Sequence, residues 1–257
     1  MIRHFPSLAC FPWLAAAVST RRGGVSAPPY DTLNLGLHVV DDPEAVIENR
    51  RRFCAEVGVE LDSVVAGAQV LGRAVAWVTE ADRGRGAYDE ASALPDTDAL
   101  ITDSPGVSLL AFSADCPLIA IVDSDRRAIG LAHASRKGTF GRIAARTVLA
   151  MEKLLGCRPD TMHAAMAPCI GSCCYEVGRE IIADAPDDMG QHFHEHRGKL
   201  FLDLWEANVE QLITTGLPAQ HIARPAACTC CSSGTFFSYR ASGGRTGRFG
   251  LLLSLRG

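Results

Sequence analysis

The stretch that most constrains the fold is the largely apolar segment 106–139. Three apolar runs, at 107–112, 117–122 and 128–132, are separated by a Ser-Ala-Asp-Cys turn and by a polar turn. Each run is too short for a helix and is rich in Val, Ile and Leu, so we predict three buried β-strands. Cys116 precedes one strand and His133 ends another. Such a pair could be a nucleophile with its base, half of a metal site, or a thiol and an imidazole that only support packing.

The rest of the chain predicts a mixture of strands and helices. Asp42, Pro43 and Glu44 form a helix start with a capping side chain, and Gly58 ends that helix. We expect further strands at 13–19, 64–70, 74–79, 162–166, 236–240 and 249–255, further helices at 139–155, 175–185 and 203–212, and an exposed loop at 81–96.

Arg50 falls on the apolar face of the first predicted helix, together with Val46, Phe53 and Val57. A guanidinium group on an inward face needs an anionic partner, because burying an unpaired charge is costly. The alternative is an arginine whose stem lies along the edge of the apolar face while its charge reaches water.

Length and charge exclude several classes of protein. A chain of 257 residues is within the range of one large α/β domain. The net charge of −4 and the scattered basic residues give no reason to expect nucleic acid or an acidic membrane as partner. No apolar stretch approaches the roughly 20 residues of a membrane span. The N-terminus lacks a basic region and contains Pro6 and Pro12, so we interpret it as a strand and not a secretory signal, and expect a cytoplasmic protein.

Six of the ten cysteines form two groups, Cys169, Cys173 and Cys174 followed by Cys228, Cys230 and Cys231. In a cytosolic chain, free thiols or a metal site are expected in preference to disulfides. The groups do not form the two Cys-x-x-Cys pairs of a zinc ribbon, so packing is our expectation for most of them and zinc the alternative. His192, His194 and His196 alternate in a polar stretch that we interpret as a loop and not as a metal site.

Several motifs together resemble one family, the YfiH-like proteins, also called laccase-domain or multicopper polyphenol oxidoreductase proteins. The matching segments are Thr20-Arg-Arg-Gly-Gly-Val-Ser, Pro29-Tyr-Asp-Thr-Leu-Asn-Leu-Gly-Leu-His-Val, Asn49-Arg50, Ala114-Asp-Cys, Ala132-His-Ala, Ala167-Pro-Cys-Ile-Gly-Ser-Cys-Cys-Tyr-Glu, Leu202-Asp-Leu-Trp, Phe236-Phe-Ser-Tyr-Arg and Thr246-Gly-Arg. The resemblance implies one α/β (α+β) domain over residues 1–257. Its mixed β-sheets pack face to face with helices outside, similar to the catalytic domain of cytotoxic necrotising factor.

The resemblance also implies an activity on purine nucleosides: phosphorolysis of adenosine, inosine and methylthioadenosine, and deamination of adenosine. The family's site is a zinc ion bound by two His and one Cys. Carried onto this chain, the Cys is Cys116 and one His is His133, whereas the other His, of a Gln-Val-His-Gly motif, is replaced by Leu71. Catalytic zinc normally has three protein ligands. His38 is a possible substitute by residue type, and Asp115 and Cys169 are weaker ones.

For substrate and phosphate, the resemblance points to Arg50, Asn34 and Lys137. Arg50 matches a family arginine assigned to phosphate. Lys137 stands where the family has an arginine, so it keeps the charge but loses the bidentate fork. The expected partners are a purine nucleoside and phosphate, without nucleic acid or membrane. The sequence does not predict an oligomeric state.

Three functional hypotheses stay open. The first is a zinc-dependent purine nucleoside enzyme in which another side chain replaces the missing ligand. The second is a metal-free hydrolase with Cys116 as nucleophile and His133 as base. The third is a degenerate member that binds a nucleoside or a partner protein without turnover. Copper oxidation of phenols is weaker than all three, because Leu71 also breaks the two-His-one-Cys set of a copper site.

Overall fold

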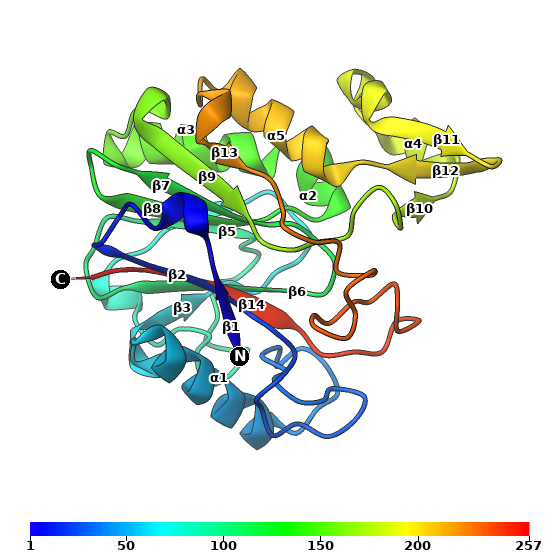
Figure 1. Cartoon of the computed structure of the whole chain (residues 1–257). Helices are drawn as coiled ribbons and strands as arrows, with labels where there is room; N and C mark the ends of the chain where they lie inside the picture. Colours follow the sequence, from blue (N-terminus) through cyan, green and yellow to red (C-terminus); the bar gives the residue numbers. More distant parts are fainter. Residues whose placement is uncertain (257) are drawn as a thin grey trace.

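The computed structural model describes residues 1–256, and two β-sheets packed face to face form its centre (Figure 1). The five-stranded sheet has the order β1 (Ile2–His4), β2 (Leu14–Ser19), β14 (Phe249–Leu255), β6 (Ser108–Ser113) and β3 (Val64–Ala66). The six-stranded sheet has the order β13 (Ile222–Ala223), β9 (Met162–Met166), β7 (Leu118–Asp123), β8 (Ala128–His133), β5 (Ala99–Thr102) and β4 (Val75–Trp77). Each sheet contains parallel and antiparallel pairs, which confirms the expected mixed sheets of an α+β fold.

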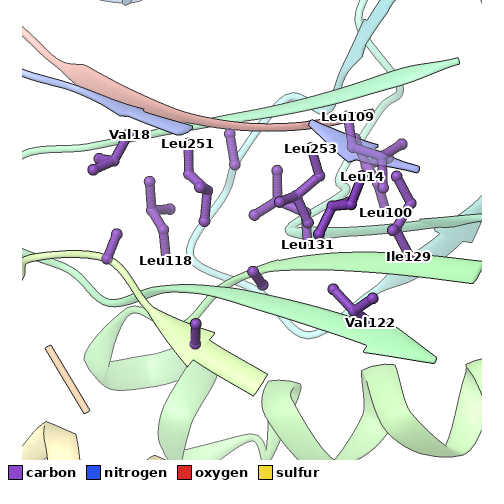
Figure 2. Packing of buried hydrophobic residues seen from close by; sticks show 14 of the residues in the cluster. Leu14, Val18, Leu100, Leu109, Leu118, Val122, Ile129, Leu131, Leu251 and Leu253 are labelled. Atoms are coloured by element: carbon purple, nitrogen blue, oxygen red, sulfur yellow. The ribbon is translucent and has the colours of Figure 1, made fainter. Parts of the chain in front are cut away.

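The space between the two sheets is filled by one apolar core (Figure 2). Leu118 and Val122 of β7 meet Leu251 and Leu253 of β14 there. The alternate residue Ile119 points to the opposite face of its sheet, where helices cover it. Both faces of these strands are therefore apolar, which explains why the sequence shows continuous apolar runs instead of alternation. The three strands predicted in 106–139 are confirmed as β6, β7 and β8.

Helices cover the outer faces of both sheets (Figure 1). Helix α1 (Pro43–Val57) packs on the five-stranded sheet, and α3 (Ile143–Leu155) and α5 (Leu204–Thr214) pack on the six-stranded one. The predicted caps of α1 are confirmed: the Asp42 carboxylate accepts from the Glu44 backbone N–H, and Gly58 has a φ of 83°. The single helix expected at 139–155 is instead α2 (Arg136–Phe140) and α3, divided at Gly141-Arg142.

A small third sheet lies beside the main body and consists of β10 (Glu176–Val177), β12 (Lys199–Leu202) and β11 (Phe193–His196) (Figure 1). The helix expected at 175–185 is wrong over most of its length, because β10 pairs with β12 and only α4 (Glu180–Asp184) is helical. Short 3₁₀ helices occupy Pro6–Leu8, Leu61–Ser63, Glu80–Asp82, Pro159–Thr161, Asp187–His192 and Ala219–His221.

Three further expectations need correction. The segment 236–240 is irregular and ends in a turn, and it is not a strand, although Phe236 and Phe237 are buried in the core between the sheets. The loop 81–96 is not wholly exposed, since Ala87 is fully buried. The histidines of 192–196 do not lie in a loop alone: His192 is buried 2.8 Å from the Glu210 carboxylate, and His194 stacks on a ring of β12.

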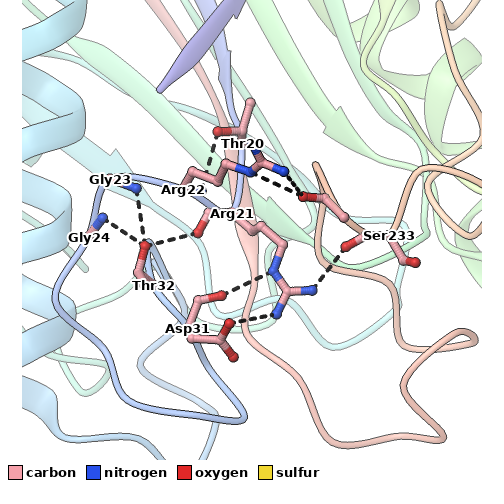
Figure 3. Close-up of polar contacts among 9 residues, drawn as sticks. Thr20, Arg21, Arg22, Gly23, Gly24, Asp31, Thr32 and Ser233 are labelled. Carbon is pink, nitrogen blue, oxygen red and sulfur yellow. Dashed lines mark hydrogen bonds and ion pairs between the residues drawn. The ribbon is translucent and has the colours of Figure 1, made fainter.

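The loop that follows β2 joins distant parts of the chain (Figure 3). The Arg21 guanidinium donates to the Asp31 backbone carbonyl at 3.0 Å and to the Ser233 carbonyl at 2.9 Å. Gly24 passes so close to Thr32 that an added Cβ would lie 2.1 Å from the Thr32 carbonyl oxygen, so only glycine fits there. Between residues 1 and 256, no helix has both the length and the apolar character that crossing a membrane requires.

Candidate functional site

A cavity of about 520 Å³ opens where the chain passes from one large sheet to the other. Residues 114–117 connect β6 of the five-stranded sheet to β7 of the six-stranded sheet, and His133 ends the neighbouring β8. The cavity is lined by both members of the predicted pair, three of the positions discussed for the third ligand, three aromatic rings and two arginines. In that order, these residues are Cys116, His133, His38, Leu71, Asp115, Phe112, Tyr175, Tyr239, Arg240 and Arg248.

His133 is held by a buried carboxylate. Its Nδ1 lies 2.8 Å from Asp98 Oδ1, and both side chains are almost completely buried. The contact follows from sheet pairing, because Asp98 immediately precedes β5, whose first residue pairs with the last residues of β8. Burial alone lowers the pKa of His133, but the Asp98 carboxylate and the neighbouring Cys116 thiol outweigh it and raise this pKa to about 9. With Nδ1 engaged, the other ring nitrogen is the one available for chemistry.

The same carboxylate also shapes the loop that carries Leu71. Asp98 Oδ2 accepts from the backbone N–H groups of Val70 at 3.1 Å and Gly72 at 2.7 Å. Burial raises the pKa of Asp98, but the hydrogen bonds from His133 and this loop lower it overall. Leu71 at the loop tip has a φ of 60° and a side chain 47% exposed in the cavity wall. That left-handed conformation favours Gly, Asn, Asp and His over leucine.

His38 faces the same cavity and is neutral at neutral pH. Its pKa is lowered to about 4 by the protein atoms that enclose the ring, by Arg248 and Arg50, and more weakly by His133. The ring therefore keeps its lone pair for a hydrogen bond or a metal ion.

The donors around this cavity do not fit the three-ligand metal site of the family. Cys116 and His133 supply two donors, and Leu71 supplies none. His38 faces the cavity but does not form a group of three closely spaced donors with Cys116 and His133. Asp115 already accepts from the Thr229 hydroxyl at 2.5 Å and from the Arg240 backbone N–H at 2.7 Å. Over residues 1–256, the one group of three or more closely spaced Cys, His, Asp or Glu side chains is elsewhere and consists of Cys173, Cys174, Cys228 and Cys231. That group could hold a metal ion.

Arg50 is buried, as its place on the apolar face of α1 predicts, but its partners are not anionic. The guanidinium donates to the carbonyls of Leu35 at 2.8 Å, Gly86 at 2.6 Å and Ala87 at 2.8 Å, and it lies 4.5 Å from the centre of the Phe112 ring. Burial lowers the pKa of Arg50 to about 9. Arg50 borders a second, small cavity of about 40 Å³. His38 and Phe112 line both this cavity and the larger one.

The structure does not bring Asn34 or Lys137 to the lining of the larger cavity. Asn34 is buried and accepts from the backbone N–H groups of Gly36 and Arg248, and Lys137 is exposed on α2. Arg248 and Arg240 bring positive charge to the cavity instead. The signal for them in the sequence is three arginines within the Gly-rich segment 240–248, which lacks a recognised phosphate motif.

Comparisons with known proteins extend over nearly the whole chain. A family model described as multi-copper polyphenol oxidoreductase laccase matches residues 15–256. Purine nucleoside phosphorylase YlmD of Geobacillus stearothermophilus is 39% identical over 243 residues, which cover 93% of this chain and 89% of the relative. Adenosine deaminase RL5 of an unknown prokaryotic organism is 34% identical over 241 residues, 90% of each chain. The crystal structure of YlmD from G. stearothermophilus superposes with a TM-score of 0.93 and 37% identity, covering 98% of this chain and 94% of that one.

Proposed function

Because this chain belongs to the multi-copper polyphenol oxidoreductase laccase family, as its motifs predict, we propose that it is an enzyme that acts on purine nucleosides in the Cys116–His133 cavity. Relatives named purine nucleoside phosphorylase and adenosine deaminase support the substrate class. The observation that carries the proposal is the buried Asp98–His133 pair beside Cys116 in the wall of the cavity. A volume of about 520 Å³ suits a small-molecule ligand.

The lining offers complementary groups for each part of a nucleoside. The rings of Phe112, Tyr175 and Tyr239 can contact the flat faces of a purine. Arg248 and Arg240 can attract phosphate. Arg50 adds positive charge from the small neighbouring cavity, which also contains His38 and Phe112 in its wall. Asn34 would act indirectly, by accepting the backbone N–H of Arg248, and Lys137 would contribute only long-range charge.

In phosphorolysis, a phosphate oxygen attacks C1′ of the ribose and the bond from C1′ to the base breaks. We assign to His133 the transfer of a proton to the departing purine, with Asp98 holding the imidazole in place. In adenosine deamination, water attacks C6 of the base and ammonia leaves, and the same acid would protonate the departing amino group. No step uses a metal ion, because the donors at this cavity are incomplete; zinc or copper there would require a third ligand in place of Leu71.

The test is product analysis with adenosine, inosine and methylthioadenosine, each with and without phosphate. Free base that appears only with phosphate indicates phosphorolysis, and inosine formed from adenosine without phosphate indicates deamination. We expect His133→Ala to lower kcat/KM by about 10²–10⁴-fold. Cys116→Ala should lower kcat/KM less, because this thiol acts only as a neighbour of the imidazole. Cys10→Ala, which alters an exposed thiol, is the matched control. Binding without product in folded wild-type protein would contradict the enzyme and favour a nucleoside-binding protein.

A second candidate, a metal-free Cys–His hydrolase, is favoured by one specific contact. The Asp98 carboxylate orients an imidazole that neighbours a thiol, and this is the order of groups in acid–base–nucleophile triads. With chelator present, iodoacetamide should alkylate Cys116 about tenfold faster than Cys10, and His133→Ala should remove the difference. Equal rates in the wild type would exclude an activated thiolate.

A further inference from the structure

Four cysteine sulfurs converge at the surface, outside the residues that line the cavity. Cys173 and Cys174 lie in the turn that follows β9, and Cys228 and Cys231 lie in the segment that follows β13. The Sγ–Sγ distances are 3.4 Å for Cys174–Cys231, 3.7 Å for Cys173–Cys231 and 3.8 Å for Cys173–Cys174. All four sulfurs lie within 4.8 Å of one another.

These distances suit a common central ion. Zinc binds thiolates at about 2.3 Å in a tetrahedron, and that geometry separates the sulfurs by about 3.8 Å. A disulfide needs sulfurs about 2.05 Å apart and would use only two of the four groups. All four thiols are free, and Cys173 and Cys231 are exposed, so an ion can enter without unfolding of the chain.

The structure also explains why the spacing of these cysteines in the sequence does not by itself indicate a zinc site. Cys228 and Cys231 are a Cys-x-x-Cys pair, but Cys230 lies between them and obscures the spacing. Their partners are two adjacent cysteines, a spacing that zinc ribbons do not use. Cys169 and Cys230 are left out of the group, and Cys169 is fully buried as a packing residue. The expectation of simple packing is therefore correct for Cys169 but does not account for the four that converge.

Two neighbouring groups would stabilise negative charge on the sulfurs. The Gly171 backbone N–H donates to Cys228 Sγ at 3.2 Å. A zinc ion with four thiolates has a net charge of −2, and Arg240, which donates to the carbonyls of Cys174 at 3.0 Å and Glu176 at 2.9 Å, places positive charge beside the group.

We propose that Cys173, Cys174, Cys228 and Cys231 form a structural zinc site that fastens the turn after β9 to the segment after β13. Four protein ligands leave no open position, which is typical of structural and not catalytic zinc. The two segments already touch, because the Thr229 backbone N–H donates to the Cys169 carbonyl at 3.1 Å. The ion would add a strong link between them.

This link has a consequence for the cavity. The turn after β9 supplies Ile170 and Tyr175 to the cavity wall. In the other segment, the Thr229 hydroxyl donates to Asp115, which lines the cavity beside Cys116. Loss of the ion would therefore loosen two walls of the cavity without removing any residue that contacts the substrate. The zinc site does not depend on which reaction the cavity supports.

The test is elemental analysis of the full chain, purified under reducing conditions from zinc-containing medium. We expect about one zinc per chain in the wild type and almost none in Cys231→Ser. Cys230→Ser is the matched neighbour outside the group, and Cys116→Ala removes the thiol of the cavity; both should retain the ion. Chelation should lower the Tm of the wild type by about 5–10 °C and leave that of Cys231→Ser unchanged. Cobalt exchanged into the wild type should give the absorption of tetrahedral thiolate coordination, a readout that requires no variant to fold.

Four results would overturn the proposal. One is wild-type protein in which the thiols of Cys173, Cys174, Cys228 and Cys231 all react with a thiol reagent and no stoichiometric zinc is present. Another is copper or an iron–sulfur cluster in place of zinc, since thiolates also select these. A third is zinc that survives Cys231→Ser but is lost in Cys116→Ala, which would place the ion in the cavity. The last is a disulfide within the group under the reducing conditions of purification.

Discussion

Leu71 shows how a single residue can keep the backbone of a site while its chemistry changes. The loop is fixed from both sides of Leu71, because Asp98 accepts the N–H groups of Val70 and Gly72. A left-handed conformation costs a non-glycine residue about 1–2 kcal/mol. The side chain recovers little of this through packing, since 47% of it is exposed. The position therefore suits a histidine better than the leucine that occupies it.

We expect Leu71→His to create a metal site in the cavity together with Cys116 and His133. Zinc content should rise from about one to about two ions per chain, and Tm should not fall, because histidine tolerates this backbone better. Elemental analysis and thermal unfolding measure both effects. Leu71→Ala should gain no metal, and Cys116→Ala added to Leu71→His should abolish the gain. A variant that stays at the wild-type zinc content would show that Leu71 does not point where a ligand is needed.

The candidate site was only partly predictable at this scale. Cys116 and His133 could be found because each stands at the end of an apolar strand. Asp98 was missed, since its role depends on the antiparallel pairing of β5 with β8, which the local pattern does not contain. For Arg50, burial was predictable but its partners were not, because they are backbone carbonyls of two loops, 15 and 36–37 residues away in sequence.

Among the elements, those that carry their own start and stop signals were predicted best. Helix α1 has the Asp42 cap and the left-handed Gly58, and both are local. The segments that failed are defined by distant partners: Glu176 and Val177 join a sheet through β12, and 236–240 is irregular while its phenylalanines fill the core. Those tertiary contacts outweighed the local propensity of these segments for helix or strand.

At the contact between β8 and α3, we expect Gly130→Ala to destabilise the protein. An added Cβ would lie 2.8 Å from Met151 Sδ and 3.0 Å from Thr147 Cγ2, so the Met151 side chain must shift and the contact with Thr147 is crowded. The expected cost is about 1–3 kcal/mol in the free energy of unfolding, measured by urea denaturation. Gly190→Ala is the control, because a Cβ there meets nothing within 4 Å. Equal stability of the two variants would mean that the contact between β8 and α3 has room for an added methyl group.

At the scale of the whole molecule, the function proposed here depends on how the two large sheets are joined. The cavity lies at the crossover between β6 and β7, so its walls come from both sheets and from the loops at their ends. The apolar core between the sheets sets their separation, and with it the positions of Cys116 and His133. Core packing and cavity geometry are therefore linked.

Leu253 tests this link, because it is fully buried between the sheets (Figure 2). We expect Leu253→Ala to cost about 2–5 kcal/mol through lost contacts and the void left behind, and to lower Tm by roughly 5–15 °C. Calorimetry measures the change. Leu149→Ala is the matched control, since that leucine is 53% exposed on α3. A comparable loss in both variants would argue that the burial of Leu253 between the sheets does not account for the cost.

The place of β14 in the five-stranded sheet also concerns the growing polypeptide on the ribosome. β14 lies between β2 and β6, yet it is synthesised after every other strand of the molecule that the structure describes. Until it emerges, β2 and β6 each present an unpaired edge, and the core lacks Leu251, Leu253 and Leu255. Such edges invite pairing with other chains. The central sheet therefore cannot close until β14 has left the ribosome, and chaperones that shield exposed strands would act in that interval.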